Sequence, residues 1–174
     1  MIVGPMYAGK TEELIRRVRR AVYAKQACAT FKHSLDVRYS EDDIITHDGQ
    51  SIQCVGAQSS NDLVSLWALR QEDAQVVAID EVQFFDEGIV NFVSELIKAK
   101  KRVLIAGLDM DYTGAPFGSI PQLMAIADEV TKLKAVCSLC GSDAMFSKRL
   151  TNNTNQVLVG ADKKYMAVCR AHFN

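Results

Sequence analysis

The sequence lacks any long hydrophobic run, and no stretch approaches the ~18 consecutive apolar residues of a membrane-spanning helix. It also lacks an excess of charge, because 20 Lys and Arg stand against 21 Asp and Glu, and it has no internal repeat or low-complexity segment. The composition therefore predicts neither a nucleic-acid partner nor a membrane partner. The first residues do not have the pattern of a signal peptide, and we expect a soluble protein in the cytoplasm.

At 174 residues, the chain is long enough for one well-cored domain with a small appendage. Its five cysteines are an odd number and unevenly placed, and two of them form a C-x-x-C pair. In a reducing compartment this spacing favours metal binding over disulfides. Cys28 and Cys54 stand alone in apolar surroundings, which predicts buried thiols.

A phosphate-binding pattern lies at the start of the chain. The motif G-x-x-x-x-G-K-[ST] is matched by Gly4, Pro5, Met6, Tyr7, Ala8, Gly9, Lys10 and Thr11. It follows an apolar pair and precedes a helix-like run, as this motif requires, and its backbone N–H groups would surround the phosphates of ATP. We expect Lys10 to reach the β- and γ-phosphates and Thr11 to bind Mg²⁺. An ordinary glycine-rich turn is the alternative.

A second phosphate-site motif ends the apolar run Val76–Ile79. Such an unbroken run is typical of a central parallel strand covered on both faces. The run ends in Asp80 and Glu81. In this Walker B arrangement Asp80 would hold Mg²⁺ through water, while Glu81 would point at the attacking nucleophile. A polar strand end without this chemistry is the alternative.

The hydrophobic periodicity predicts alternating helices and strands. We expect helices over 11–24, 61–70, 86–100 and 119–130, and strands over 28–31, 51–55, 76–81, 102–107 and 131–136. Repeating strand and helix units predict a parallel α/β sheet with right-handed connections. The arginines of the first helix are interpreted as a solvated outer face rather than as nucleic-acid contacts; they are Arg16, Arg17, Arg19 and Arg20.

A polar stretch follows the second predicted strand, from His33 to Tyr39 and on to Gly49. Ligands of an α/β sheet lie beyond the carboxyl ends of its strands, so Asp36 and Arg38 are placed to face the phosphates. An ordinary surface loop fits this stretch equally well.

After residue 136 the pattern changes to a helix-poor tail with strand-like pieces over 144–150, 156–159 and 165–168. Two ligand pairs flank it, Cys137 with Cys140 and Cys169 with His172. Four soft ligands in two knuckles predict a closed, structural Zn²⁺ site, although unpaired thiols and a stray histidine are the alternative. The polar segment 151–155 between the pairs is a candidate lid tied at its base by the metal.

Together these motifs resemble those of the type II thymidine kinases, a zinc-containing P-loop family. The resemblance is carried by GPMYAGKT at 4–11, DVRY at 36–39, IDEVQFF at 79–85, PFG at 116–118, KLKAVCSLC at 132–140, KRL at 148–150 and YMAVCRAH at 165–172. It implies a RecA-like α/β domain with a parallel sheet over residues 1–136. It also implies a small C-terminal zinc-binding domain over 137–174, with a lasso loop that closes over the base.

The resemblance further implies transfer of the ATP γ-phosphate to the 5′-hydroxyl of thymidine, which gives dTMP in deoxynucleotide salvage. A homotetramer and feedback inhibition by dTTP are implied too, with no nucleic-acid or membrane partner. If residues 156–160 fold over the base, their backbone groups can read the polar edge of thymine. Deoxyuridine, which lacks one methyl group, should then be accepted and deoxycytidine rejected.

Individual roles also follow from the resemblance. Glu81 is implied to be the general base, Lys10 and Arg38 to assist catalysis, and Asp36, Asp80 and Gln83 to belong to the nucleotide and Mg²⁺ site. The thymidine pocket is implied to be lined by Met6, Phe84, Leu108, Tyr112, Phe117, Ser147, Gln156, Val157, Leu158, Val159, Gly160 and Tyr165. The chain departs from the family pattern at Val82, where many relatives have Gly, and at Tyr112, where Phe is common; neither change removes a reacting group.

Two other functions are compatible with parts of the sequence. A RecA-type P-loop ATPase module acting on nucleic acid would use the same two phosphate motifs, but the chain lacks a second motor domain and an evident basic face. A zinc-ribbon interaction protein that merely binds nucleotide is the third hypothesis.

Overall fold

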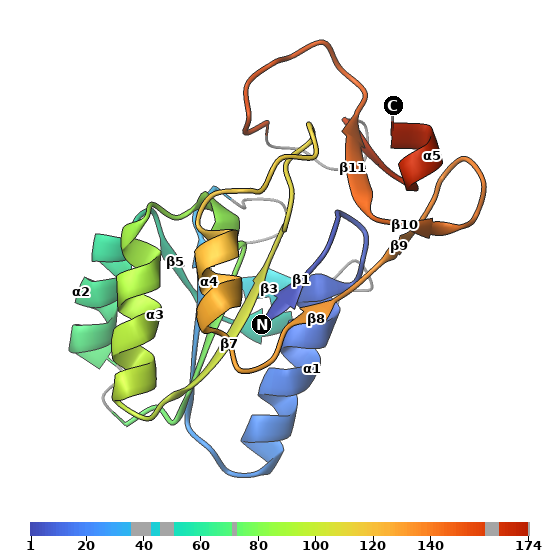
Figure 1. The fold of residues 1–174 in the computed structure, drawn as a ribbon. Coiled ribbons are helices and arrows are strands. Elements are labelled where there is room, and N and C mark those ends of the chain that lie inside the picture. Colours follow the sequence, from blue (N-terminus) through green and yellow to red (C-terminus); the bar gives the residue numbers. More distant parts are fainter. Residues whose placement is uncertain (36–42, 46–50, 71–72, 159–163, 174) are drawn as a thin grey trace.

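A six-stranded parallel sheet forms the centre of the computed structural model, which describes residues 1–35, 43–45, 51–70, 73–158 and 164–173 (Figure 1). The strands lie in the order β5 (Val55–Ala57), β2 (Cys28–His33), β6 (Val76–Asp80), β7 (Arg102–Gly107), β1 (Ile2–Val3) and β8 (Thr131–Lys132). Each neighbouring pair is parallel. The predicted α/β class with a parallel sheet is confirmed.

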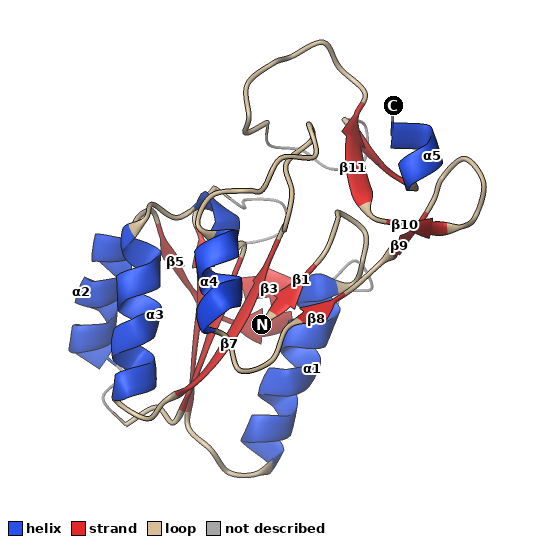
Figure 2. Cartoon of the chain, viewed as in Figure 1, coloured by secondary structure: helices blue, strands red, loops and turns tan. Residues whose placement is uncertain are grey.

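Helices cover both faces of this sheet. Figure 2 shows α2 (Ser60–Arg70), α3 (Gly88–Lys98) and α4 (Ile120–Ile126) on one side and α1 (Lys10–Tyr23) on the other. Along β6, Val77 and Ile79 join the core under α2, α3 and α4, whereas Val76 and Ala78 join the core under α1. Every residue of β6 is buried, which explains why its first four residues are apolar without alternation.

Helix α1 carries acidic residues in its first turn and a basic residue in its last turn, which complements the helix dipole. Arg16, Arg19 and Arg20 are exposed, as the sequence predicts. Arg17 differs: its side chain is only 14% exposed and pairs with Glu13 at 2.8 Å. It also donates to the hydroxyl of Thr131 at 2.8 Å and thereby ties α1 to β8.

Several predicted elements have different limits in the structure. The predicted strand 131–136 divides into β8 of the main sheet and β9 (Ala135–Val136), which pairs antiparallel with β10 (Asp143–Ala144). The predicted strand 51–55 also divides, because β4 (Ser51–Gln53) pairs antiparallel with β3 (Asp43–Ile45) while β5 joins the main sheet. A short 3₁₀ turn, η1 (Val82–Phe84), follows β6.

Other predictions fail at single sites. Residues 156–158 of the predicted strand 156–159 form no strand, and the predicted helix 119–130 ends at Ile126 because Ala127 has an extended backbone. Cys54 is buried, as predicted, but Cys28 is only partly buried.

Among the described residues no helix has the length and apolar character needed to cross a membrane.

The C-terminal part forms its own small core beyond the main sheet (Figure 1). Strands β11 (Phe146–Arg149) and β12 (Tyr165–Val168) pair antiparallel and lead into the short helix α5 (Arg170–Phe173). The rings of Phe146 and Phe173 stack with their centroids 4.3 Å apart. Since Ala135 of β9 also belongs to this core, the domain boundary after residue 136 stays a prediction.

His33 ends β2 as a buried residue, only 4% exposed, rather than opening a polar surface loop. Its ring packs edge-on against Phe85, with centroids 4.6 Å apart. Nδ1 accepts the backbone N–H of Leu35, so the proton lies on Nε2, which donates to the carbonyl of Gln58 at 3.1 Å. Burial lowers the pKa of His33, although the Gln58 carbonyl opposes this effect.

This burial predicts a specific loss of stability in mild acid. The unfolded chain takes up a proton at His33 near pH 6.5, and the folded chain does so only at lower pH. The stabilisation is therefore present above about pH 6.5 and is lost as the pH falls through the folded pKa, by at most about 1.4 kcal/mol per pH unit. In urea titrations between pH 7.5 and 5.5, the free energy of unfolding should fall less in His33→Gln than in the unmodified chain. Equal pH slopes in the two proteins would contradict this assignment.

Candidate active site

The predicted P-loop connects β1 to α1 through backbone conformations that favour glycine. Gly4 has φ +149°, and a Cβ atom there would lie 2.5 Å from the carbonyl oxygen of Leu133. Gly9, with φ +76°, directly precedes the first turn of α1. Tyr7 has φ +64°, a conformation that non-glycine residues rarely adopt. The loop therefore has a tightly curved backbone at the N-terminus of a helix, where phosphate groups bind.

The two phosphate motifs meet at the carboxyl edge of the sheet. The Thr11 hydroxyl donates to Asp80 Oδ2 at 3.0 Å, and the backbone N–H of Glu81 donates to Asp80 Oδ1 at 2.9 Å. The Lys10 ammonium donates to the carbonyl of Pro5 at 2.8 Å, which holds it against its own loop. Residues far apart in sequence are thus brought together as the P-loop and Walker B patterns predict.

Gln83, a predicted residue of the nucleotide site, is hydrogen-bonded to Glu81. The Glu81 carboxylate, in a residue only 8% exposed, accepts a hydrogen bond from Gln83 Nε2 at 2.6 Å. The amide oxygen of Gln83 accepts the backbone N–H of Leu108 at 3.0 Å. Gly107 has no room for a side chain, because a Cβ atom would lie 2.8 Å from Gln83 Oε1. The Gln83 amide is thus fixed at both ends and orients Glu81.

An aromatic wall stands beside Glu81. Phe84 and Phe117 pack at right angles with centroids 5.8 Å apart, and Phe84 also contacts His33 edge-on at 5.9 Å. Gly118 has φ +51°, and a Cβ atom there would lie 2.7 Å from the Gln83 carbonyl oxygen. The predicted pocket residues Phe84, Leu108 and Phe117 therefore lie around the segment that carries Glu81.

The C-terminal hairpin contacts the P-loop directly. The backbone N–H of Met6 donates to Ser147 Oγ at 2.9 Å, and the Tyr7 hydroxyl donates to the carbonyl of Tyr165 at 3.3 Å. Ser147 is only 5% exposed. These contacts place two predicted pocket residues, Ser147 and Tyr165, beside the phosphate loop, which itself contains a third, Met6.

The segment 150–158 extends from the same hairpin and returns to Asp111 and Tyr112. Tyr112 donates through its hydroxyl to the carbonyl of Thr154 at 3.0 Å, and the side-chain amide of Gln156 donates to Asp111 Oδ2 at 2.9 Å. Burial raises the pKa of Asp111, but hydrogen bonds from Thr113 and Gln156 outweigh it and hold the pKa below its usual range. Val157 is 37% exposed.

The remaining predicted site residues, Asp36, Arg38, Val159 and Gly160, lie outside the described part of the chain. Sequence reasoning also missed two residues of the site. Asp111 holds Gln156, and Arg149 contacts several backbone carbonyls of the loop. The only sequence signal for Arg149 was its place in the KRL motif, immediately before the loop.

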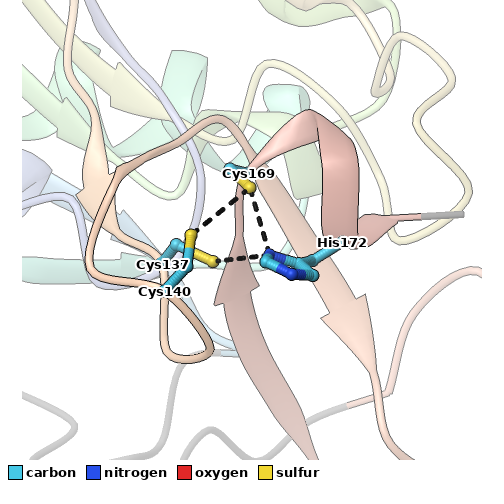
Figure 3. Close-up of side chains that lie close together, drawn as sticks. All are labelled: Cys137, Cys140, Cys169 and His172. Carbon is cyan, nitrogen blue, oxygen red and sulfur yellow. Dashed lines mark hydrogen bonds between the residues drawn. The ribbon is translucent and has the colours of Figure 1, made fainter.

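The four predicted metal ligands converge at the base of the hairpin (Figure 3). Their ligand atoms all lie within 4.8 Å of one another, and the sulfurs of Cys140 and Cys169 are 3.8 Å apart. His172 Nδ1 lies 3.6 Å from the sulfur of Cys137 and 3.3 Å from that of Cys169. Zinc–ligand bonds of ~2.3 Å to sulfur and ~2.0–2.1 Å to nitrogen, in a tetrahedron, require edges of about 3.8 and 3.6 Å. The Cys₃His set therefore fits Zn²⁺.

The surroundings of Cys137 favour the thiolate, whereas burial raises the pKa of Cys169. Burial raises the pKa of Cys137, but backbone N–H groups of Cys169, Leu139 and Cys140, with His172, lower it to about 6. The thiolate is the form of cysteine that binds a metal. All four ligands come from the protein, which leaves no open coordination position and indicates a structural role.

Comparison with known proteins agrees with this geometry. The family model described as thymidine kinase matches residues 1–173. The chain belongs to the thymidine kinase family. A thymidine kinase of Bacteroides thetaiotaomicron is 48% identical over 170 residues, which cover 98% of this chain and 83% of the relative. A thymidine kinase of Bacteroides fragilis is 47% identical with the same coverage.

Membership of the thymidine kinase family settles the class of enzyme, an ATP-dependent nucleoside kinase. A kinase of this class must hold ATP and a nucleoside at one site. The P-loop and the Walker B acids lie at one end of the arrangement described above, and the hairpin that carries the Cys₃His cluster, with its loop, lies at the other.

Zinc removal provides a direct test of the cluster in this thymidine kinase family member. We expect metal analysis to find about one zinc per chain. When the free zinc concentration is ~1,000 times the dissociation constant, removing the metal lowers the free energy of unfolding by about 4 kcal/mol. In a chain of this size, that loss lowers the melting temperature by roughly 8–16 °C. Cys140→Ser should lose the metal and the stability together. Cys28→Ser, which lies outside the cluster, should retain both; zinc at full occupancy in Cys140→Ser would contradict the ligand set.

Proposed function

We propose that this chain transfers the γ-phosphate of ATP to the 5′-hydroxyl of thymidine and so produces dTMP in deoxynucleotide salvage. The observation that carries the proposal is the contact between Met6 of the P-loop and Ser147 of the zinc-tethered hairpin, at 2.9 Å. Through this contact the phosphate loop and the predicted nucleoside pocket share one site. An ATPase acting on a long polymer has no need of such a tethered loop.

In this proposal the phosphates of ATP bind along residues 4–11, and the Lys10 ammonium neutralises the β- and γ-phosphates. Mg²⁺ would be held by the Thr11 hydroxyl and, through water, by Asp80. The Thr11 hydroxyl oxygen and Asp80 Oδ2 lie 3.0 Å apart. Oxygen ligands of this kind suit Mg²⁺, which neutralises phosphate charge when it is bound there. Asp36 and Arg38 are proposed to complete the phosphate site.

Glu81 acts as the general base. It takes the proton of the thymidine 5′-hydroxyl as that oxygen bonds to the γ-phosphorus, while the bond to the β,γ-bridging oxygen breaks and ADP leaves. The hydrogen bond from Gln83 keeps the Glu81 carboxylate in one orientation. Phe84 and Phe117, whose rings pack at right angles, supply an apolar wall for the nucleoside; Phe117 is buried and Phe84 is partly buried.

Base recognition falls to the loop. Backbone groups of residues 156–160 read the polar edge of thymine, with Met6, Leu108, Tyr112 and Tyr165 around the ring. The same pocket holds the base of dTTP while its phosphates run toward the P-loop, which accounts for feedback inhibition by one molecule that occupies both ends of the site. A homotetramer and a cytoplasmic location, where ATP and free nucleosides are available, complete the proposal and rest on the family resemblance.

Turnover assays separate this function from the nucleic-acid ATPase hypothesis. ADP release should require thymidine or deoxyuridine, and one molecule of dTMP or dUMP should form for each ADP released. Deoxycytidine, whose polar edge is reversed at two positions, should be rejected by a large factor, because an unpaired buried polar group costs ~1–3 kcal/mol. dTTP should inhibit the reaction. Turnover stimulated by single-stranded DNA and unaffected by thymidine would overturn the kinase function.

Replacing the base tests the mechanism. Glu81→Gln keeps the size of the side chain but cannot take a proton, so kcat should fall ~10²–10⁴-fold while the KM for ATP changes little. The matched control is Glu87→Gln, an exposed glutamate at the start of α3, which should retain full activity. If Glu81→Gln is as active as the control, proton removal belongs to another group.

A further inference from the structure

Backbone carbonyls of the loop 151–158 are hydrogen-bonded by side chains rather than by other backbone groups. Its residues belong to no helix or strand, and among the described residues no backbone–backbone hydrogen bond involves them. Its carbonyl groups nevertheless have partners, because side chains donate to the carbonyls of Asn153, Thr154, Asn155, Gln156 and Leu158. The conformation of this loop therefore depends on a few side chains rather than on secondary structure.

Arg149 supplies most of these donors. Its Nη1 donates to the carbonyls of Asn153 at 2.9 Å and Asn155 at 2.5 Å, and its Nη2 donates to the carbonyl of Gln156 at 3.0 Å. Hydrogen bonds from a charged donor are stronger than neutral ones, and the flat guanidinium presents several N–H groups in fixed directions. One side chain thus holds three backbone carbonyls of the loop.

The same guanidinium also orients two aromatic residues of the pocket. Its Cζ lies 3.6 Å from the ring centroid of Tyr112, and its Nε and Nη2 donate to the Tyr165 hydroxyl at 3.1 and 2.6 Å. Each tyrosine hydroxyl then donates to the loop, Tyr112 to Thr154 and Tyr165 to Leu158. Arg149 and Tyr165 face each other across the hairpin in register, so the arrangement is built on paired strands.

We propose that Arg149 is a positioning residue for the nucleoside: it fixes loop residues 153–158 and the two tyrosines as one unit, and so determines the affinity for thymidine without touching the reacting atoms. This inference deepens the proposed function and rests on it for the identity of the nucleoside. The phosphate end of the site is held by separate contacts, between Thr11 and Asp80 and between Lys10 and Pro5. A defect at Arg149 should therefore fall on one substrate only.

The test compares Arg149→Lys with Arg170→Lys in the full chain. Lysine keeps the charge but has one ammonium group, which can neither stack flat on Tyr112 nor reach three carbonyls at once. Arg149→Lys should raise the KM for thymidine about 10- to 100-fold and leave the KM for ATP within about twofold. Arg170 is on α5 and its guanidinium lies over the ring of Phe146. Arg170→Lys should therefore leave the KM for thymidine and the KM for ATP unchanged.

Hydrogen exchange supplies a readout that does not depend on activity. In Arg149→Lys the amide of Asn155, which donates to Asn153 Oδ1 at 2.8 Å, should exchange faster, whereas the amides of α1 and β6 keep their protection and the zinc content is unchanged. A thymidine KM equal to that of the unmodified chain, unchanged exchange in the loop, or a parallel rise of both KM values would overturn the proposal. If the unmodified chain does not phosphorylate thymidine, the proposed function fails, but the exchange experiment still tests whether Arg149 fixes the loop.

Discussion

The carboxylate of Asp80 is the group on which the reactive end of the site depends. One oxygen accepts the hydroxyl of Thr11 and the other accepts the backbone N–H of Glu81, so a single side chain joins the phosphate loop to the segment that carries Glu81, the proposed general base. This works because β7 alone separates β1 from β6 in the sheet, and all three strands end at the same edge. From Glu81 the connection continues through Gln83 to Leu108.

Backbone strain is concentrated along this connection. In the part of the chain that the structure describes, four non-glycine residues have positive φ, and two of them, Lys25 and Lys100, follow the ends of α1 and α3, where a left-handed residue is common. The other two are Tyr7 in the P-loop and Glu81 after β6. Such a conformation costs about 1–2 kcal/mol per residue, and it persists only where neighbours enforce it. Here those neighbours include Tyr165, Asp80 and Gln83, and the result is a site whose groups are positioned before substrates bind.

The sequence predicted those parts of the molecule that depend on local pattern or fixed spacing. The apolar run of β6, the P-loop and the four metal ligands are patterns of this kind, and the structure brings each of them together as expected. The sequence did not predict contacts between residues that lie far apart in the chain. Nothing local separates β8 from β9 within 131–136, since only their different partners, β1 and β10, divide them. His33 reads as polar but is buried against aromatic rings, and the two rings that Arg149 contacts, Tyr112 and Tyr165, lie elsewhere in the sequence.

We propose that the phosphate loop and the hairpin that carries the Cys₃His cluster form two ends of one substrate site, joined where Met6 meets Ser147. This arrangement can be tested by titration calorimetry with a bisubstrate molecule, in which the 5′-oxygen of thymidine is linked through an oligophosphate to adenosine. We expect one molecule to bind per chain, saturation with it to block the binding of both thymidine and ATP, and Lys10→Ala to weaken its binding. If thymidine still binds with unchanged affinity to the bisubstrate-saturated protein, the nucleoside site lies elsewhere and the two ends do not form one site.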